Sequence, residues 1–169
     1  MRKRLAAAVL IPLLGLAPES AAGLTGCGNF KWPVTRERAL LTTSDLPNLA
    51  SGVDAPTLPP LAAKLALRPV ADAGLPKPSE RTRKPGTFAG FLRLGQIPAG
   101  TYTVSVSDYA WIDVLQNGSS LRPMDISEAS GCDGIQRVLR FDLAAGSTTI
   151  QVGSVAANTI RLAVTPSSD

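Results

Sequence analysis

Two carboxylates stand close together in the chain, where they could act as a catalytic pair. Asp108 and Asp113 lie on either side of Tyr109. A pair of carboxyl groups can hydrolyse a glycosidic bond when the fold holds them at the right separation. Sequence spacing does not set that separation, so the favoured interpretation places Asp108 in a turn and Asp113 on the solvent face of a strand. A small carboxylate-based hydrolase is the alternative, and no catalytic residue is assigned.

Two aromatic residues in the same stretch suggest a binding surface. Tyr109 falls in a turn, and Trp111 falls on the strand face opposite the apolar residues at 112 and 114. An exposed tryptophan on a sheet can stack on the apolar face of a sugar ring. The competing interpretation, which we favour, packs Trp111 under a proline-rich segment or against Trp32, because large apolar surfaces are usually covered. Trp111, Tyr109 and Asp113 are the candidate binding residues.

The absence of histidine removes several chemistries. It excludes a Ser-His-Asp or Cys-His arrangement, a zinc site with imidazole ligands and the two-histidine, one-carboxylate site of iron oxygenases. Neither a P-loop nor a dinucleotide-binding fingerprint occurs, so no cofactor is predicted. Asp125, Glu128 and Asp133 could offer oxygens to calcium, but they lack the spacing of a calcium-binding loop, and no metal is predicted.

The N-terminal residues are typical of a secretory signal. A basic start is followed by the uncharged apolar run Leu5 to Ala17, and small residues at Ser20 and Ala22 predict cleavage after Ala22, so residues 1–22 form the signal peptide. The run is shorter than the roughly 20 residues of a spanning helix, which disfavours an uncleaved anchor. We therefore expect a periplasmic or secreted protein with no membrane contact after cleavage.

Charge gives little support to a polyanionic partner such as nucleic acid. The 17 Lys and Arg residues and 13 Asp and Glu residues fall to 14 and 12 without the signal, a net charge of +2. Nucleic-acid binding usually shows a stronger and more clustered basic footprint. The basic residues between Lys77 and Lys84 could attract anionic envelope polymers, although a charged run in a loop is usually solvated surface.

The two cysteines allow two interpretations. In an exported protein, Cys27 and Cys132 most simply form a disulfide, which would close a loop of about 105 residues and tie the N-terminal segment to the rest. The residues before Cys27, Leu24-Thr25-Gly26, instead look like a lipobox, in which Cys27 would be lipidated and anchor the protein. A polar stretch that includes Glu19 separates the apolar run from Cys27, and lipidation would leave Cys132 alone, so the disulfide is favoured.

The first half of the mature chain, residues 23–86, is rich in proline. Proline fixes φ and donates no hydrogen bond, so this part cannot form a long helix or a central strand. One short helix is predicted over Thr35 to Leu41, with Thr35 as N-cap. One edge strand is predicted within Leu61 to Val70, and Gly74 to Pro85 is predicted to be a solvated loop. We expect 23–86 to pack on the surface of the domain.

The second half, residues 87–169, alternates apolar and polar residues with a period of two. Tyr102, Val104 and Val106 alternate with hydroxyl residues, which predicts one buried and one solvent face. Asn117-Gly118 predicts a type I′ hairpin turn. The other predicted strands lie at 88–94, 110–116, 119–122, 136–143, 148–152 and 160–164, with a loop at 123–134. Short strands separated by frequent turns predict an all-β fold, an antiparallel β-sandwich of jelly-roll type, forming one domain with 23–86.

One segment of this half resembles another. The nine residues from Pro98 to Val106 are similar to those from Ala144 to Val152. In both, a glycine turn leads into an alternating strand, so we expect the same local structure to be used twice.

Four short motifs resemble a family of small exported proteins of Gram-negative bacteria. The motifs, which together span most of the mature chain, are Cys27 with Phe30-Lys31-Trp32, Trp111-Ile112-Asp113-Val114, Gly131-Cys132-Asp133-Gly134 and Val164-Thr165-Pro166. The resemblance includes both cysteines and so supports the disulfide over lipidation. Some members carry a homogentisate 1,2-dioxygenase label, but a chain without histidine cannot build the iron site of that enzyme.

These observations predict an exported, non-catalytic accessory or binding module of the cell envelope. The partner is an envelope component, with a glycan as the candidate ligand. The alternatives are the carboxylate-based hydrolase and a purely structural or protein-binding module.

Overall fold

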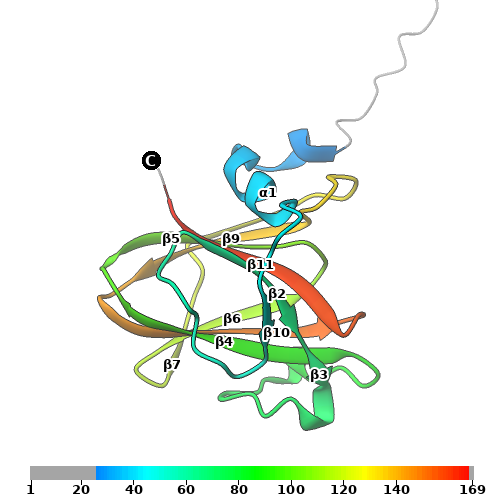
Figure 1. Cartoon of the computed structure of the whole chain (residues 1–169), viewed down its shortest axis with the longest axis vertical. Coiled ribbons are helices and arrows are strands. Elements are labelled where there is room, and N and C mark those ends of the chain that lie inside the picture. Colours follow the sequence, from blue (N-terminus) through cyan, green and yellow to red (C-terminus); the bar gives the residue numbers. More distant parts are fainter. Residues whose placement is uncertain (1–25, 168–169) are drawn as a thin grey trace, which may run out of the picture.

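The computed structural model describes residues 26–167, and the predicted signal peptide lies outside the described residues. Eleven strands in the described part form two facing sheets (Figure 1). Sheet A has, in spatial order, β1 (Asn48–Ala50), β2 (Leu61–Ala66), β11 (Thr159–Pro166), β5 (Gly100–Val106), β9 (Arg137–Leu143) and β8 (Asp125–Glu128). Sheet B has β3 (Arg68–Pro69), β4 (Phe88–Ile97), β10 (Gly146–Val155), β6 (Trp111–Gln116) and β7 (Ser119–Leu121). The predicted all-β sandwich is confirmed.

The strands pair in the nested order of a jelly roll. β2 pairs with β11, β4 with β10, β5 with β9, and β6 with β7, all antiparallel. A chain that is folded double and then rolled into two sheets gives this pairing of first with last. The short strands β1, β3 and β8 extend the edges, and β1 pairs parallel to β2.

The repeated segment forms the two corners of this roll. One copy carries the chain from β4 in sheet B to β5 in sheet A, and the other carries it from β9 in sheet A to β10 in sheet B. Gly100 pairs with Leu143 at the end of β9, and Gly146 pairs with Ile97 at the end of β4. The two corners therefore lie side by side. Both glycines have positive φ, 157° and 137°, which the sharp change of sheet requires.

The alternating residues predicted to face inward fill the space between the sheets. Val104, Val114, Phe141, Ile150 and Leu162 are at most 1% exposed. Thr103 and Ser105, which alternation placed on a solvent face, are also buried. That expectation was wrong because a helix covers this part of the outer face of sheet A.

The covering helix is α1 (Thr35–Leu41), and its bounds agree with the prediction. The N-cap residue is Val34 rather than Thr35, and no side chain caps the helix. α1 lies on the outer side of sheet A (Figure 1), where it contacts β2 and β11. A second hydrophobic cluster joins Val34 and Leu41 to Val138 and Ala163 of the sheet. No helix among residues 26–167 is long and apolar enough to cross a membrane.

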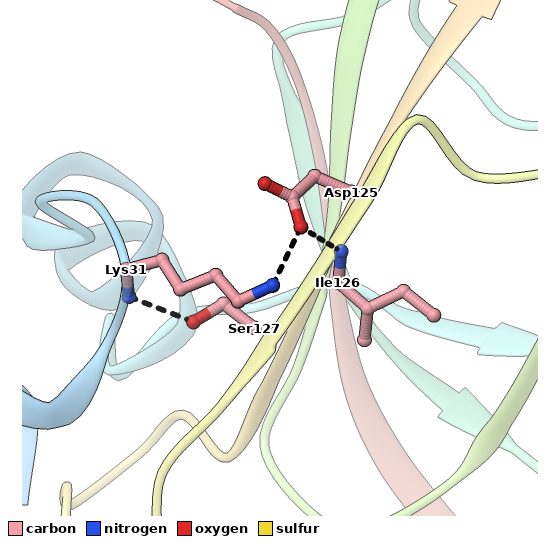
Figure 2. A network of polar contacts seen from close by, with 4 residues as sticks. All are labelled: Lys31, Asp125, Ile126 and Ser127. Carbon is pink, nitrogen blue, oxygen red and sulfur yellow. Dashed lines mark hydrogen bonds and ion pairs between the residues drawn. The ribbon is translucent and has the colours of Figure 1, made fainter.

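Covalent and polar contacts fasten the segment before α1 to the sandwich. The predicted disulfide between Cys27, in the 3-10 turn η1 (Gly26–Asn29), and Cys132 is present. Figure 2 shows a second attachment, in which Lys31 Nζ donates to Asp125 Oδ1 at 2.7 Å and the Lys31 backbone N–H donates to Ser127 Oγ at 2.9 Å. The Lys31 bond, with the backbone N–H of Ile126, lowers the pKa of Asp125. Asp125, Ile126 and Ser127 belong to β8, where the sequence predicted a loop.

The stretch Gly74 to Pro85 is a largely exposed loop, as predicted, but it is also fixed to sheet B. The Gln151 side chain on β10 accepts from the backbone N–H of Lys77 at 2.8 Å and donates to the Lys77 carbonyl at 3.0 Å. Thr82, in the short turn η3 (Glu80–Thr82), is fully buried against Gly153. This stretch therefore lies across the outer face of sheet B. A further turn, η2 (Val70–Asp72), precedes it.

The strand at Leu61–Ala66 was also misplaced by the sequence. It was expected at an edge, but β1 pairs with its free side, which makes β2 an internal strand of sheet A. Pro69, which motivated the expectation, lies instead in β3 at the edge of sheet B.

The contact between Thr82 and Gly153 gives a first prediction. A Cβ at Gly153 would come within 2.6 Å of Thr82 Cβ, whereas a Cβ at Gly95 meets nothing within 4 Å. Gly153→Ala should therefore lower the free energy of unfolding by about 1–3 kcal/mol by overpacking. Chemical denaturation followed by circular dichroism measures this. The matched variant Gly95→Ala should stay within about 1 kcal/mol of the parent, and equal effects at both positions would contradict this packing.

Removal of the disulfide gives a second prediction. The cross-link joins residues 105 apart in sequence, and a loop of that size contributes about 4–5 kcal/mol in the chain-entropy model. The double variant Cys27→Ser, Cys132→Ser should lose about that much stability in urea-unfolding measurements. Reductant should destabilise the parent and leave the double variant unchanged. Equal stability of parent and variant would contradict the role of the bridge.

Candidate functional site

A groove of about 510 Å³ opens between β7, at one edge of sheet B, and β8, at one edge of sheet A. Ile112, Leu121, Ile126 and Leu139 give it apolar walls. Its polar side chains are those of Ser79, Arg81, Asp113, Arg122 and Arg137, and Trp111 completes the lining. We call this the Trp111 groove.

Arginine and aromatic side chains alternate from the groove to Tyr109, which lies outside its lining. The Arg81 guanidinium lies 4.9 Å from the Trp111 ring centre, and the Arg137 guanidinium lies 5.0 Å from the same ring and 5.2 Å from that of Tyr109. Such cation–π contacts are attractive, and more so when they are shielded from water. The structure thus brings the candidates Trp111 and Tyr109 together through Arg137.

Trp111 is half-buried, and its neighbour from the proline-rich half is Arg81. Trp32, the other partner considered from the sequence, lines a different cavity beside Arg140. Tyr109 is exposed and borders a shallow hollow with Glu128 and Gln136.

Arg137 is, with Ser79 and Arg122, one of the groove residues that the sequence did not single out. It is 6% exposed, its Nη1 donates to the Ala110 carbonyl at 3.0 Å, and its Nε lies 3.6 Å from Glu128 Oε2. A buried charge needs such compensation. The alternation of the sequence could have indicated it, because Arg137 is two residues before Leu139 and therefore lies on the same inward face of β9. An arginine in an inward-facing register is unusual enough to mark a site.

Asp113 lies in the groove with little polar compensation. Its Oδ2 is inaccessible and has no hydrogen-bond partner. Burial raises the pKa of Asp113, while the Ser79 hydroxyl and the Arg81 guanidinium work in the opposite direction. Asp108, by contrast, is exposed, accepts a hydrogen bond from Ser107 Oγ at 2.7 Å and lines another cavity. The two carboxylates of the hydrolase alternative therefore do not face a common cavity.

The backbone of β6 adds polar groups to the groove. The hairpin turn has positive φ at Asn117 and Gly118, 50° and 73°, as a type I′ turn requires. β7 pairs with β6 only as far as Val114. Hydrogen-bonding residues alternate along an antiparallel edge, so the N–H and C=O of Ile112 face the side that β7 has left. Two residues before Ile112, the carbonyl of Ala110 accepts a hydrogen bond from Arg137.

The acidic residues considered for calcium do not gather. Asp125 pairs with Lys31 and Glu128 with Arg137, whereas Asp133 lines the cavity that also contains Asp108. Residues 26–167 contain no group of three side chains placed to hold a metal ion. The calcium alternative has no support in this geometry.

Comparison with known proteins places the chain in no family. No family model matches it, and no curated protein matches it. A solved structure that matches is the periplasmic inhibitor of g-type lysozyme, PliG, from Aeromonas hydrophila, with 18% identity over 71% of this chain and 99% of that chain and a TM-score of 0.36. A likeness at this level assigns neither an activity nor a partner. The resemblance to small exported proteins of Gram-negative bacteria stays a prediction.

The environment of Asp113 gives a third prediction. Because its pKa is raised on folding, the folded chain binds this proton more tightly than the unfolded chain. Stability should therefore fall as pH rises from the ordinary value of 3.8 through the raised pKa. Asp113→Asn should remove this decrease and be more stable than the parent at neutral pH.

Thermal unfolding between pH 3 and pH 7 measures the effect. Asp142→Asn, on the exposed side of β9, is the matched control and should follow the pH dependence of the parent. If the stability of the parent and that of Asp113→Asn changed with pH in the same way, the burial of this carboxyl group would be contradicted.

Proposed function

We propose that the chain is an exported, non-catalytic binding module of the cell envelope whose Trp111 groove contacts an acidic glycan. The observation that carries the proposal is the contact of Arg81 and Arg137 with the Trp111 ring in a groove with apolar walls, next to Tyr109, which contacts Arg137 from outside the groove. Concave sites that combine apolar walls with a few convergent polar groups are the usual places for small ligands.

The groove offers the two kinds of contact that a sugar needs. The apolar side chains and the accessible part of Trp111 suit the C–H face of a sugar ring. The backbone N–H and C=O of Ile112 can bond to hydroxyl groups, which both donate and accept. A volume of about 510 Å³ is within the range of sites for small ligands.

The charge of the groove favours an acidic sugar over a neutral one. Three arginines, Arg81, Arg122 and Arg137, line it together with one carboxyl group, Asp113. Arginine binds carboxylate and phosphate groups through paired N–H donors. Arg122 is exposed and in none of the three ion pairs of residues 26–167, so it is available to a ligand.

Two further observations support an exported protein without catalysis. The disulfide Cys27–Cys132 suits an oxidising compartment, since such bonds are rare in the cytosol. Asp113 has no second carboxylate in its groove with which to share acid and base roles.

A binding experiment with matched arginine variants tests the function. The disulfide-bonded chain from residue 23 is titrated with alginate oligosaccharides, which carry carboxylates, and with dextran, which is neutral. Pull-down on isolated cell-wall sacculi is run in parallel. Arg122→Ala should weaken binding of the alginate oligosaccharides about three- to tenfold without changing the melting temperature, because this exposed side chain has no structural partner.

The control is Arg83→Ala, which removes the same charge from an exposed arginine that lies outside the groove. It should bind like the parent. Equal loss in both variants would mean that general charge, and not the groove, attracts the ligand. Failure of alginate, dextran and sacculi to bind would reject a glycan and favour a structural or protein-binding module.

A further inference from the structure

A second cavity, of about 470 Å³, lies between the start of α1 and the outer face of sheet A. Trp32 lines it with Arg36 and Glu37 of α1, Thr103 of β5 and Arg140 of β9. We call it the Trp32 cavity. It is separate from the Trp111 groove and shares no lining residue with it.

The cavity holds two guanidinium groups that form no ion pair within residues 26–167, although the Asp125 carboxylate is near enough to Arg140 to interact with it electrostatically. Arg140 stacks on Trp32, with its guanidinium 4.3 Å from the ring centre. Arg140 Nε and Trp32 Nε1 are both inaccessible and lack hydrogen-bond partners. Arg36 donates only to a carbonyl, that of Pro166, at 3.2 Å. Neither arginine takes part in the three ion pairs between described residues.

The cavity also holds a carboxylate without a cationic partner. Glu37 is nine-tenths buried, and its Oε1 accepts a hydrogen bond from Thr165 Oγ1 at 2.9 Å. Among residues 26–167 no lysine or arginine nitrogen lies within ion-pair distance of Glu37. A buried charge that is not neutralised by the protein is costly, and a bound ligand of opposite charge removes that cost.

The charges of the cavity select among ligand types. An anion would satisfy Arg36 and Arg140 but face Glu37, and a cation would do the reverse. A neutral ligand would pair with neither sign. A molecule with one carboxylate and one ammonium satisfies both. The hydroxyls of Thr103 and Ser167, 2.8 Å apart, add neutral polar contacts at the same cavity.

We infer that the Trp32 cavity binds a small zwitterion, a free α-amino acid, with its carboxylate at Arg140 and its ammonium at Glu37. The side chain of the amino acid would occupy the rest of the cavity beside Trp32. This site is independent of the proposed glycan function, because it lies on other elements and uses other residues.

The experiment starts from saturation-transfer NMR of the disulfide-bonded chain with a mixture of the D- and L-amino acids. At least one should bind in a saturable manner, and its affinity is then measured by calorimetry. Its N-acetyl derivative and its amide each lack one of the two charges. Both should bind about tenfold or more weakly, since hydrogen bonds to charged groups are strong.

Variants of the cavity assign the two charges. Glu37→Gln keeps an oxygen for the Thr165 bond and removes the charge, so it should weaken binding of the amino acid about tenfold or more. Arg140→Met keeps an apolar contact with Trp32 and should do the same. Arg93→Met is the control, because Arg93 also lies near an aromatic ring, that of Phe91, but outside the cavity. It should bind like the parent.

Three outcomes would overturn the inference: no amino acid binds, the N-acetyl derivative or the amide binds as well as the free amino acid, or Arg93→Met loses as much affinity as Glu37→Gln. Melting temperatures identify a variant that fails to fold. In that case the comparison of amino acid, amide and N-acetyl derivative on the parent chain decides alone. None of these outcomes bears on glycan binding at the Trp111 groove.

Discussion

The Trp111 groove depends on one buried amide. Gln151 is fully buried on β10, and its side chain bonds both the N–H and the C=O of Lys77. The side chain thereby supplies the hydrogen bonds that a neighbouring strand would supply. The segment itself has three prolines between 76 and 85 and cannot pair as a strand. Fixing Lys77 places Ser79 and Arg81 beside β6, where they complete the groove. Buried polar groups of this kind are costly unless every partner is present. The packing of Thr82 against Gly153 and the hydrogen bond from Ser154 Oγ to the Arg81 carbonyl hold the same segment in place.

The groove also gathers features that oppose stability. Arg137 is a nearly buried charge whose Nε has no hydrogen-bond partner and lies 3.6 Å from Glu128, and Asp113 has an oxygen without a partner. A core of aliphatic residues at these positions would be easier to fold. Natural proteins retain such features mainly where function needs them. The Trp32 cavity shows the same pattern on the other sheet, with Glu37 and Arg140 in place of Asp113 and Arg137.

The sequence predicts the sandwich well because its signals are local. Period-two alternation, the Asn117-Gly118 turn and the glycine of each corner act over a few residues, and all appear where expected. The pairing of two cysteines in an exported chain needs no knowledge of the fold.

What the sequence does not predict is set by distant partners. Thr103 and Ser105 have the pattern of a solvent face, and only the docking of α1 buries them. β1 and β8 are too short for a periodic signal, and each exists because a longer strand lies beside it. The groove itself joins Arg81, Trp111 and Arg137, which come from three separate parts of the chain. The types of single residues were enough to name candidates such as Trp111, but not to predict which distant residues would lie beside them.

The nested pairing also sets when the protein can fold. Leu61 lies opposite Val164, so the first long strand of sheet A finds its partner only near the end of the chain. Contacts between residues so far apart in sequence form slowly, because a long loop must close first. On a polypeptide emerging from the ribosome, β2 therefore waits for its antiparallel partner until β11 has been made.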